Sequence, residues 1–192
     1  MMKLIIIYIA AILTLFMVNS SVAADSALNQ ILSSGVLKAG TTGDFYPFSK
    51  RDTATNSYEG YDIDILNELA KDLGVEIEFV STTWATLVNG ITAEKYHVTG
   101  SASIKASRMK ASGFSDPYTA VVTKAYTTND KISRFNGWDS INQPNVKVAT
   151  TLGTSFETQV DNWFTNAEIT KVAAPARGFQ EVLVGRSDVF VT

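Results

Sequence analysis

The amino-acid sequence predicts an α/β fold with a mostly parallel sheet, and three observations lead to this prediction. Short segments rich in β-branched residues, such as 75–80, alternate with longer amphipathic segments between 27 and 99. In the clearest amphipathic segment, 61–73, apolar residues recur at helical spacing. Gly35 and Gly74 end the first two helical patterns. A strand–helix–strand–helix–strand order favours parallel strands with helices packed on the faces of the sheet.

The first half of the chain should hold the helices and strands of one such sheet. Asp62 precedes the regular apolar spacing of the second helix, so we expect it to be the N-cap of that helix. The loop 42–49 is rich in aromatic residues, and the polar stretch 50–57 should form a hairpin or a loose loop. The expected helices span 27–34, 62–73 and 84–94, and the expected strands span 36–41, 75–80 and 96–99.

The second half of the chain continues the alternation. Thr154 and Glu157 have the spacing of a capping box, which predicts that a helix begins there. Strands are expected at 121–127, 146–150, 167–172 and 188–192, a helical turn at 138–142, and a further helix at 176–184.

The composition excludes several classes of function. The chain has 192 residues, no cysteine, a single histidine and a formal net charge of −3. We therefore expect no disulfide, no thiolate metal site, no cysteine nucleophile and no nucleic-acid partner. We interpret His97 as a strand-end histidine, and we predict neither a metal site nor a cofactor. The motifs of serine hydrolases and of phosphate-binding loops are absent, which gives no support to either class.

Residues 1–24 are predicted to be a cleavable signal peptide. Lys3 precedes an uncharged and mostly apolar run over 4–18, and the small residues 21–24 resemble a signal-peptidase site. The alternative is a membrane anchor, but the run is shorter than the ~20 residues that span a bilayer. We expect an exported, soluble chain that begins near Asp25.

The segment 100–118 is the main candidate for ligand binding. Ser103 is a plausible N-cap, and Arg108 follows five residues later. The amides at a helix N-terminus carry partial positive charge, and a guanidinium matches the two oxygens of a carboxylate. The alternative is an ordinary capped helix whose arginine is solvated or paired on the surface. We favour a carboxylate site because of the flanking pattern, which consists of Ser101, Ser103 and the run 114–118.

A second candidate region lies at the end of the first strand. Ligands of parallel sheets bind at the carboxyl ends of the strands, and both 42–44 and 100–103 follow strands. Tyr46 and Phe48 could line a pocket beside this end, although Phe48 could equally pack locally. Trp84, at the start of the third expected helix, is another candidate for the pocket wall.

Several of these motifs together resemble the type II periplasmic solute-binding proteins, also called extracellular solute-binding protein family 3. The resemblance lies in the segments 60–66, 100–108 and 114–118 and in the Thr154–Ser155 turn. It implies a periplasmic-binding-protein-like fold of two lobes, with the first over 25–125 and the second over 126–192. It also implies that Arg108 holds a ligand carboxylate. The other implied ligand-binding residues are Ser101, Ser103, Thr154, Ser155, Asp44, Tyr46, Phe48 and Trp84.

The resemblance implies a periplasmic substrate-binding protein of an ABC-type uptake system. Its ligand would be a small carboxylate solute, most simply an amino acid, and its partner a membrane permease. We expect a monomer. In the family, a segment like 185–192 leads to an acidic residue that takes the ligand's ammonium group, so we expect the second lobe to be truncated within this chain.

An enzyme of the same fold is the alternative. Residues 41–49 and 141–146 resemble the cyclohexadienyl dehydratase branch, which acts on prephenate or arogenate. That chemistry needs an acid at the leaving hydroxyl, and Asp44 is the matching carboxylate in this chain. Ser155 departs from the asparagine that the branch tends to carry, which weakens this hypothesis. A sensor input domain is a third possibility.

Overall fold

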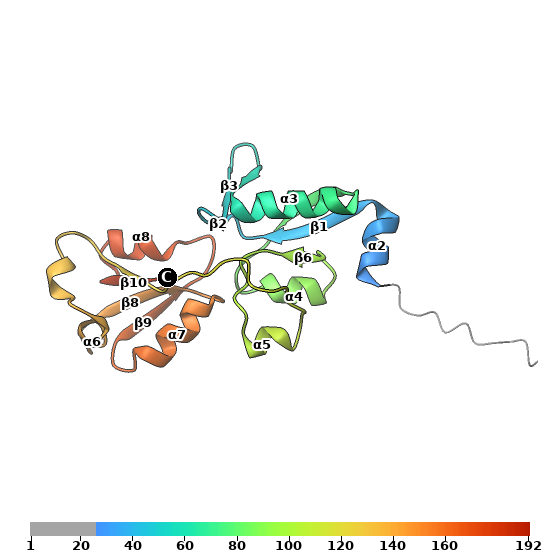
Figure 1. Cartoon of the computed structure of the whole chain (residues 1–192). Coiled ribbons are helices and arrows are strands. Elements are labelled where there is room, and N and C mark those ends of the chain that lie inside the picture. Colours follow the sequence, from blue (N-terminus) through green and yellow to red (C-terminus); the bar gives the residue numbers. More distant parts are fainter. Residues whose placement is uncertain (1–25) are drawn as a thin grey trace, which may run out of the picture.

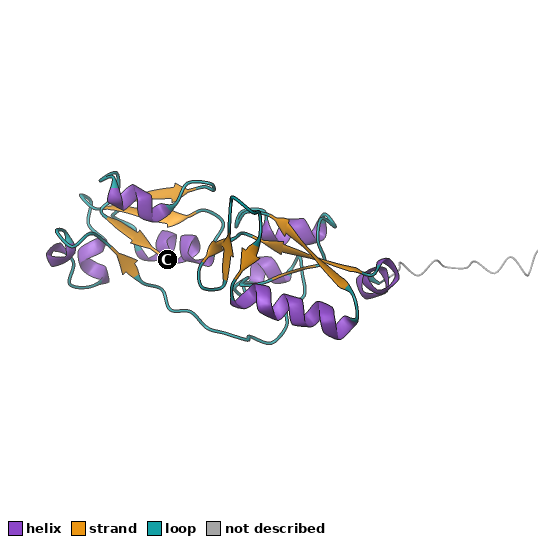
Figure 2. Cartoon of the chain, turned by 90° about the horizontal axis from the view of Figure 1, so that it is seen from above, coloured by secondary structure: helices purple, strands orange, loops and turns teal. Residues whose placement is uncertain are grey.

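The computed structural model describes residues 26–192, so the predicted signal peptide lies outside the described residues. Two α/β lobes lie side by side and are joined by a single extended segment (Figures 1 and 2). We call residues 26–111 the first lobe, residues 112–124 the crossing segment and residues 125–192 the second lobe. Within 26–192, no helix is long and apolar enough to cross a membrane.

The first lobe is built on a parallel sheet with the strand order β5-β1-β6. The helix α3 lies on one side of this sheet and α4 on the other (Figure 1). Gly35 ends α2 in the left-handed conformation, with φ 70°, which glycine adopts without strain. The elements of this sheet and its helices are α2 (Ala27–Ser34), β1 (Val36–Thr41), α3 (Tyr61–Leu73), β5 (Glu76–Ser81), α4 (Leu87–Thr92), β6 (Val98–Thr99) and α5 (Ala106–Met109).

The polar stretch 50–57, predicted to be a hairpin or a loose loop, is part of a small antiparallel sheet. This sheet contains β2 (Asp44–Phe45), β3 (Ser49–Arg51) and β4 (Tyr58–Glu59). The sheet follows directly after β1, so it holds Asp44 near the carboxyl end of the main sheet.

The second lobe repeats the same architecture. Its sheet has the order β7-β10-β8-β9, in which only β7 is antiparallel to its neighbour. The helices α7 and α8 pack on opposite faces of this sheet (Figure 1). The elements are β7 (Ala125–Tyr126), α6 (Trp138–Ile141), β8 (Lys147–Thr151), α7 (Ser155–Trp163), β9 (Glu168–Val172), α8 (Gly178–Leu183) and β10 (Val189–Val191), with a 3₁₀ turn at Ile132–Arg134.

Each lobe has its own hydrophobic core. Buried apolar side chains of the first lobe gather around Ile31, Leu37 and Ala70. The second core is larger and consists of Ile141, Val146, Val148, Val160, Phe164, Val189 and Val191. Neither of these two clusters contains residues from both lobes, so apolar packing holds each lobe together separately.

The predicted fold class is confirmed, while several element predictions were too long, including the strand expected at 96–99, which is reduced to β6. The strand expected over 121–127 is reduced to β7, because only Ala125 and Tyr126 find partners in β10. The helix expected over 84–94 is restricted to α4, and Trp84 lies in the turn that precedes it.

Two predicted N-caps were wrong. Gly60 precedes α3, and Asp62 lies buried in the first turn of that helix. Ser103 does not cap α5, which begins at Ala106 after Lys105. In both cases the side chain of the predicted cap forms hydrogen bonds with residues from other parts of the fold. The third predicted cap is confirmed, since the Thr154 hydroxyl accepts a hydrogen bond from the Glu157 amide at 3.2 Å.

Candidate functional site

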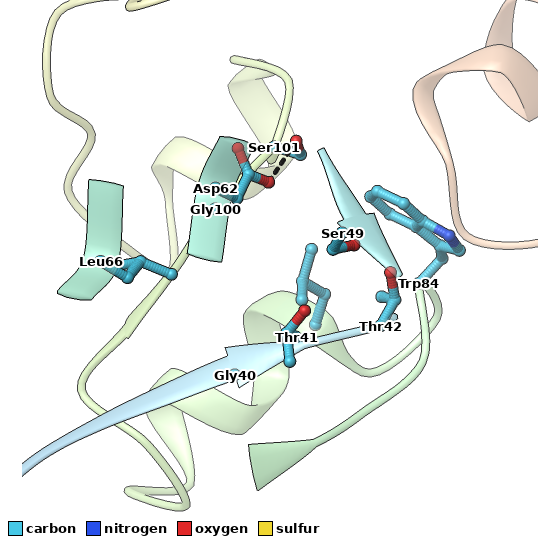
Figure 3. A pocket seen from close by; sticks show the side chains of 10 residues that line it. Gly40, Thr41, Thr42, Ser49, Asp62, Leu66, Trp84, Gly100 and Ser101 are labelled. Carbon is cyan, nitrogen blue, oxygen red and sulfur yellow. Dashed lines mark hydrogen bonds between the residues drawn. The ribbon is translucent and has the colours of Figure 1, made fainter. Parts of the chain in front are cut away.

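A small polar pocket lies where β1 and β6 end (Figure 3). Its volume is about 10 Å³, which is roughly the space of one water molecule. Trp84 lies at one side of this pocket, where its indole faces the orange-red ribbon of the second lobe (Figure 3). The lining residues are Gly40, Thr41, Thr42, Ser49, Asp62, Leu66, Trp84, Leu87, Gly100 and Ser101. The carboxyl ends of the parallel strands therefore form a polar site, as the topology predicts.

Asp62 is the centre of a hydrogen-bond network that joins the first lobe to the crossing segment. The Ser101 hydroxyl donates to Asp62 Oδ2 at 2.5 Å, and the Tyr118 hydroxyl donates to Asp62 Oδ1 at 2.9 Å. The Ser101 amide in turn donates to the Tyr118 oxygen at 2.7 Å. Burial raises the pKa of Asp62, and the hydrogen bonds from Ser101 and Tyr118 partly oppose this effect.

This network determines the shape of the loop after β6. Ser101 has a positive φ of 54°, which is uncommon for a residue other than glycine. A Cβ at Gly100 would lie 2.7 Å from the Asp62 carboxyl carbon, so the loop approaches the carboxylate as closely as glycine permits. The Ser101 hydroxyl, predicted to bind ligand, is bonded to Asp62 and holds the loop in place.

A larger cavity of about 530 Å³ lies beside the same loop. Phe45 and Phe48 form part of its wall, with their rings stacked at 5.0 Å between centroids. Ser101 and Ser103 also line it, together with the crossing segment from Ser112 to Val121. Tyr46 is 76% exposed and lines neither this cavity nor the small pocket, so the structure gives its predicted role no support.

Arg108 connects the two lobes. Its side chain is buried, with a residue exposure of 7%, and burial lowers the pKa of its guanidinium. One terminal nitrogen donates to the Ser103 carbonyl oxygen at 3.1 Å, and the other donates to the Gly153 carbonyl oxygen at 3.0 Å. Ser103 belongs to the first lobe and Gly153 to the second, so this side chain lies at the lobe boundary.

The N-terminus of α7 lies against the same residues. The Ser155 hydroxyl is 3.0 Å from the Ser103 hydroxyl across the boundary. Gly153 has φ 85°, and a Cβ there would lie 2.4 Å from the Ala85 amide nitrogen of the first lobe. The first amides of a helix lack acceptors within the helix and carry partial positive charge. The helix terminus that the second lobe brings to Arg108 is therefore that of α7, whereas the predicted helix start at Ser103 is replaced by that of α5 at Ala106.

Asp44 forms a second connection between the lobes. Its Oδ1 accepts a hydrogen bond from the Trp84 indole N–H at 2.8 Å. Its Oδ2 pairs with the guanidinium of Arg177, which directly precedes α8 in the second lobe. The Asp44 side chain is only 8% exposed. In this arrangement Asp44 accepts from two donors and is not placed as a proton donor.

The predicted site residues other than Tyr46 therefore fall into four groups. Arg108, Ser103 and Ser155 meet at the lobe boundary beside the Thr154 cap, and Asp44 pairs with Trp84. Ser101 belongs to the Asp62 network, and Phe48 to the wall of the large cavity. His97 also lines the large cavity, and its Nδ1 accepts a hydrogen bond from the Lys38 amide at 3.0 Å, which fits its predicted place at a strand end.

Sequence reasoning missed Arg177, Phe45 and the role of Asp62. Arg177 has no local pattern that marks it, because its partner lies in the other lobe. Asp62 offered a clue in its position two residues after Gly60, but helix-cap preference gave it a different role.

Two α/β lobes that meet through polar side chains are typical of the class of protein that holds small solutes between its domains, since ligand sites occur preferentially at domain interfaces. The chain belongs to the bacterial extracellular solute-binding proteins, family 3, whose pattern it matches over residues 37–175.

Curated relatives include both an enzyme and binding proteins. The chain is 32% identical over 183 residues to the cyclohexadienyl dehydratase of Pseudomonas aeruginosa, covering 95% of this chain and 68% of that protein. It is 35% identical over 103 residues to the L-cystine-binding protein TcyA of Bacillus subtilis, covering 52% and 38% of the two chains. The chain thus spans about two thirds of the first relative and less than half of the second.

Solved structures agree with this assignment. An ancestral amino acid-binding protein, described as a precursor of cyclohexadienyl dehydratase, is 37% identical with a TM-score of 0.81, covering 87% of this chain and 74% of that one. The arginine-bound form of a truncated ArgBP from T. maritima is 27% identical with a TM-score of 0.77, covering 85% and 76%.

Proposed function

We propose that this protein binds an amino acid or a similar small carboxylate between its lobes, as the binding component of an ABC-type uptake system. Relatives with names of this kind, such as the cystine-binding protein and a probable amino-acid ABC transporter-binding protein, support the proposal. The segment 1–24 supports export to the periplasm. The partners would be the amino acid and a membrane permease, and we propose that the protein acts as a monomer.

The buried guanidinium of Arg108 is the observation that carries this proposal. A guanidinium has five N–H donors, and carbonyl oxygens from the two lobes accept from two of its nitrogens. A ligand carboxylate here would contact Arg108 and the first amides of α7 at the same time. Because these donors belong to different lobes, the ligand would favour the arrangement in which the lobes are close.

Isothermal titration calorimetry with the full-length protein and a panel of L-amino acids tests the proposal. Hydrogen bonds to charged groups contribute ~1.5–3 kcal/mol each, so Arg108→Ala should weaken binding by at least about tenfold. Arg186→Ala is the matched control, since Arg186 is exposed and pairs with Glu181 in the second lobe. Unchanged affinity in Arg108→Ala would rule out this site.

Cyclohexadienyl dehydratase activity is the second candidate function, favoured by similarity to the Pseudomonas aeruginosa enzyme along 95% of this chain. The geometry of Asp44 weighs against it, because an acid catalyst must donate a proton, whereas Asp44 accepts from Trp84 and Arg177. Turnover of prephenate or arogenate above background by the purified protein would overturn the proposal of a passive binder. No turnover together with amino-acid binding would support it.

A further inference from the structure

Recognition of a ligand carboxylate does not account for the ion pair between Asp44 and Arg177. Asp44 is almost fully buried, whereas the Arg177 side chain is 37% exposed. A buried carboxylate is costly unless a positive charge or strong hydrogen bonds accompany it. Within the first lobe, the described side-chain partner of Asp44 is the Trp84 indole N–H. The positive charge that accompanies the carboxylate comes from Arg177 in the second lobe.

The position of this pair relates it to the ligand's side chain. Trp84 lines the small pocket at the strand ends together with Ser101. Its ring meets Phe45 edge to face at 5.6 Å, and Phe45 stacks on Phe48 in the wall of the large cavity. Asp44 thus lies beside the aromatic part of the site, whereas Arg108 contacts the carbonyl oxygens of Ser103 and Gly153.

We propose that Arg177 is a specificity-determining residue, which occupies the Asp44 carboxylate and thereby favours a ligand with an uncharged side chain over a cationic one. A cationic side chain could reach Asp44 only by displacing Arg177 or by placing a second positive charge beside it. Proteins commonly discriminate between ligands by such unfavourable charge placement. This inference rests on the proposed function and specifies its ligand class.

L-arginine and L-citrulline provide the test, because they have nearly the same shape and differ in the charge of the side chain. Calorimetry on the wild-type protein should show that citrulline binds at least as tightly as arginine. In Arg177→Ala, Asp44 loses its cation, so the arginine-to-citrulline affinity ratio should rise by about tenfold or more. The double variant Asp44→Asn/Arg177→Ala should lose this gain.

Two further variants make the test specific. Arg134→Ala is the control, because Arg134 pairs with Asp188 in the second lobe, and its affinity ratio should equal that of the wild type. Arg177→Gln keeps most of the side-chain volume and replaces the alanine variant if thermal melting shows that the latter is poorly folded.

The outcomes separate this inference from the proposed function. If the wild type binds neither these two ligands nor any other amino acid, the proposed function fails and the inference falls with it. The inference alone fails if the wild type binds amino acids but prefers arginine. It also fails if Arg177→Ala weakens both ligands equally, since Arg177 would then only hold the lobes together.

Discussion

Two sets of polar contacts meet at the candidate site, one inside the first lobe and one between the lobes. The inner set joins Asp62, Ser101 and Tyr118, and all of its members belong to the first lobe and the crossing segment that packs on it. The outer set joins Asp44 to Arg177, Ser103 to Ser155, and Arg108 to Gly153. The inner contacts include no residue of the second lobe, whereas the outer contacts require the lobes to be close.

The two sets of contacts should therefore have different roles in ligand binding. The hydrophobic clusters do not cross the boundary, and the contacts of the outer set join polar groups that water could also satisfy. A ligand that contacts both lobes can therefore shift how often they meet, in proportion to its preference for the closed arrangement. The inner set should instead determine the shape of the loop that receives the ligand.

The largest expected effect comes from Gly153, where the second lobe approaches the backbone of the first. In Gly153→Ala the added Cβ would overlap Ala85, so the lobes could not come as close, and ligand affinity should fall by about a hundredfold. Calorimetry measures the loss.

Gly185→Ala is the matched control for this change. Gly185 also has a positive φ, of 76°, but no atom lies within 4 Å of its would-be Cβ. Its substitution brings the same backbone cost of about 1–2 kcal/mol without the overlap. Equal losses of affinity in the two variants would show that the approach of the lobes does not matter for binding.

An intermediate effect, on stability and its pH dependence, is expected at Asp62. Burial raises the pKa of this carboxyl above its ordinary value of 3.8. Its contribution to stability is therefore full below about pH 3.8 and is lost as the pH rises through the folded-state value. Relative to Asp62→Asn, the wild type should become less stable as the pH rises through this range.

Denaturant titrations of both proteins from about pH 3 to about pH 7 measure this difference. Asp64→Asn is the control, because Asp64 lies in the same first turn of α3 but is exposed. A stability difference that grows in favour of the wild type with rising pH would contradict the raised pKa.

The smallest effect is expected for the hydroxyl pair between the lobes. Ser103→Ala and Ser155→Ala each remove one partner of a half-buried hydrogen bond, so each should weaken ligand binding by about twofold to tenfold. If the pair forms in the bound state, the double variant should lose less than the sum of the single variants, by about 0.5–1 kcal/mol. Strict additivity would show that the two hydroxyls do not meet when ligand is bound.

The sequence predicted several elements well because their determinants are local. The bounds of α2 and β1 match the predictions, and Gly35 and Gly74 end their helices in the left-handed conformation. Thr154 caps α7 because its partner amide lies only three residues away. The ligand roles of Thr154, Ser155 and the other candidate residues remain predictions.

The sequence by itself therefore determined the fold class, most of the elements and Arg108 as the residue to examine. Spacing, turn residues and caps act over a few positions, and the chain displays them directly. Only the tertiary structure decided that Asp62 binds Ser101 and Tyr118, and that Arg177 neutralises Asp44. Those partners lie far apart in sequence, and packing of the lobes is what brings their charges and hydroxyls within bonding distance.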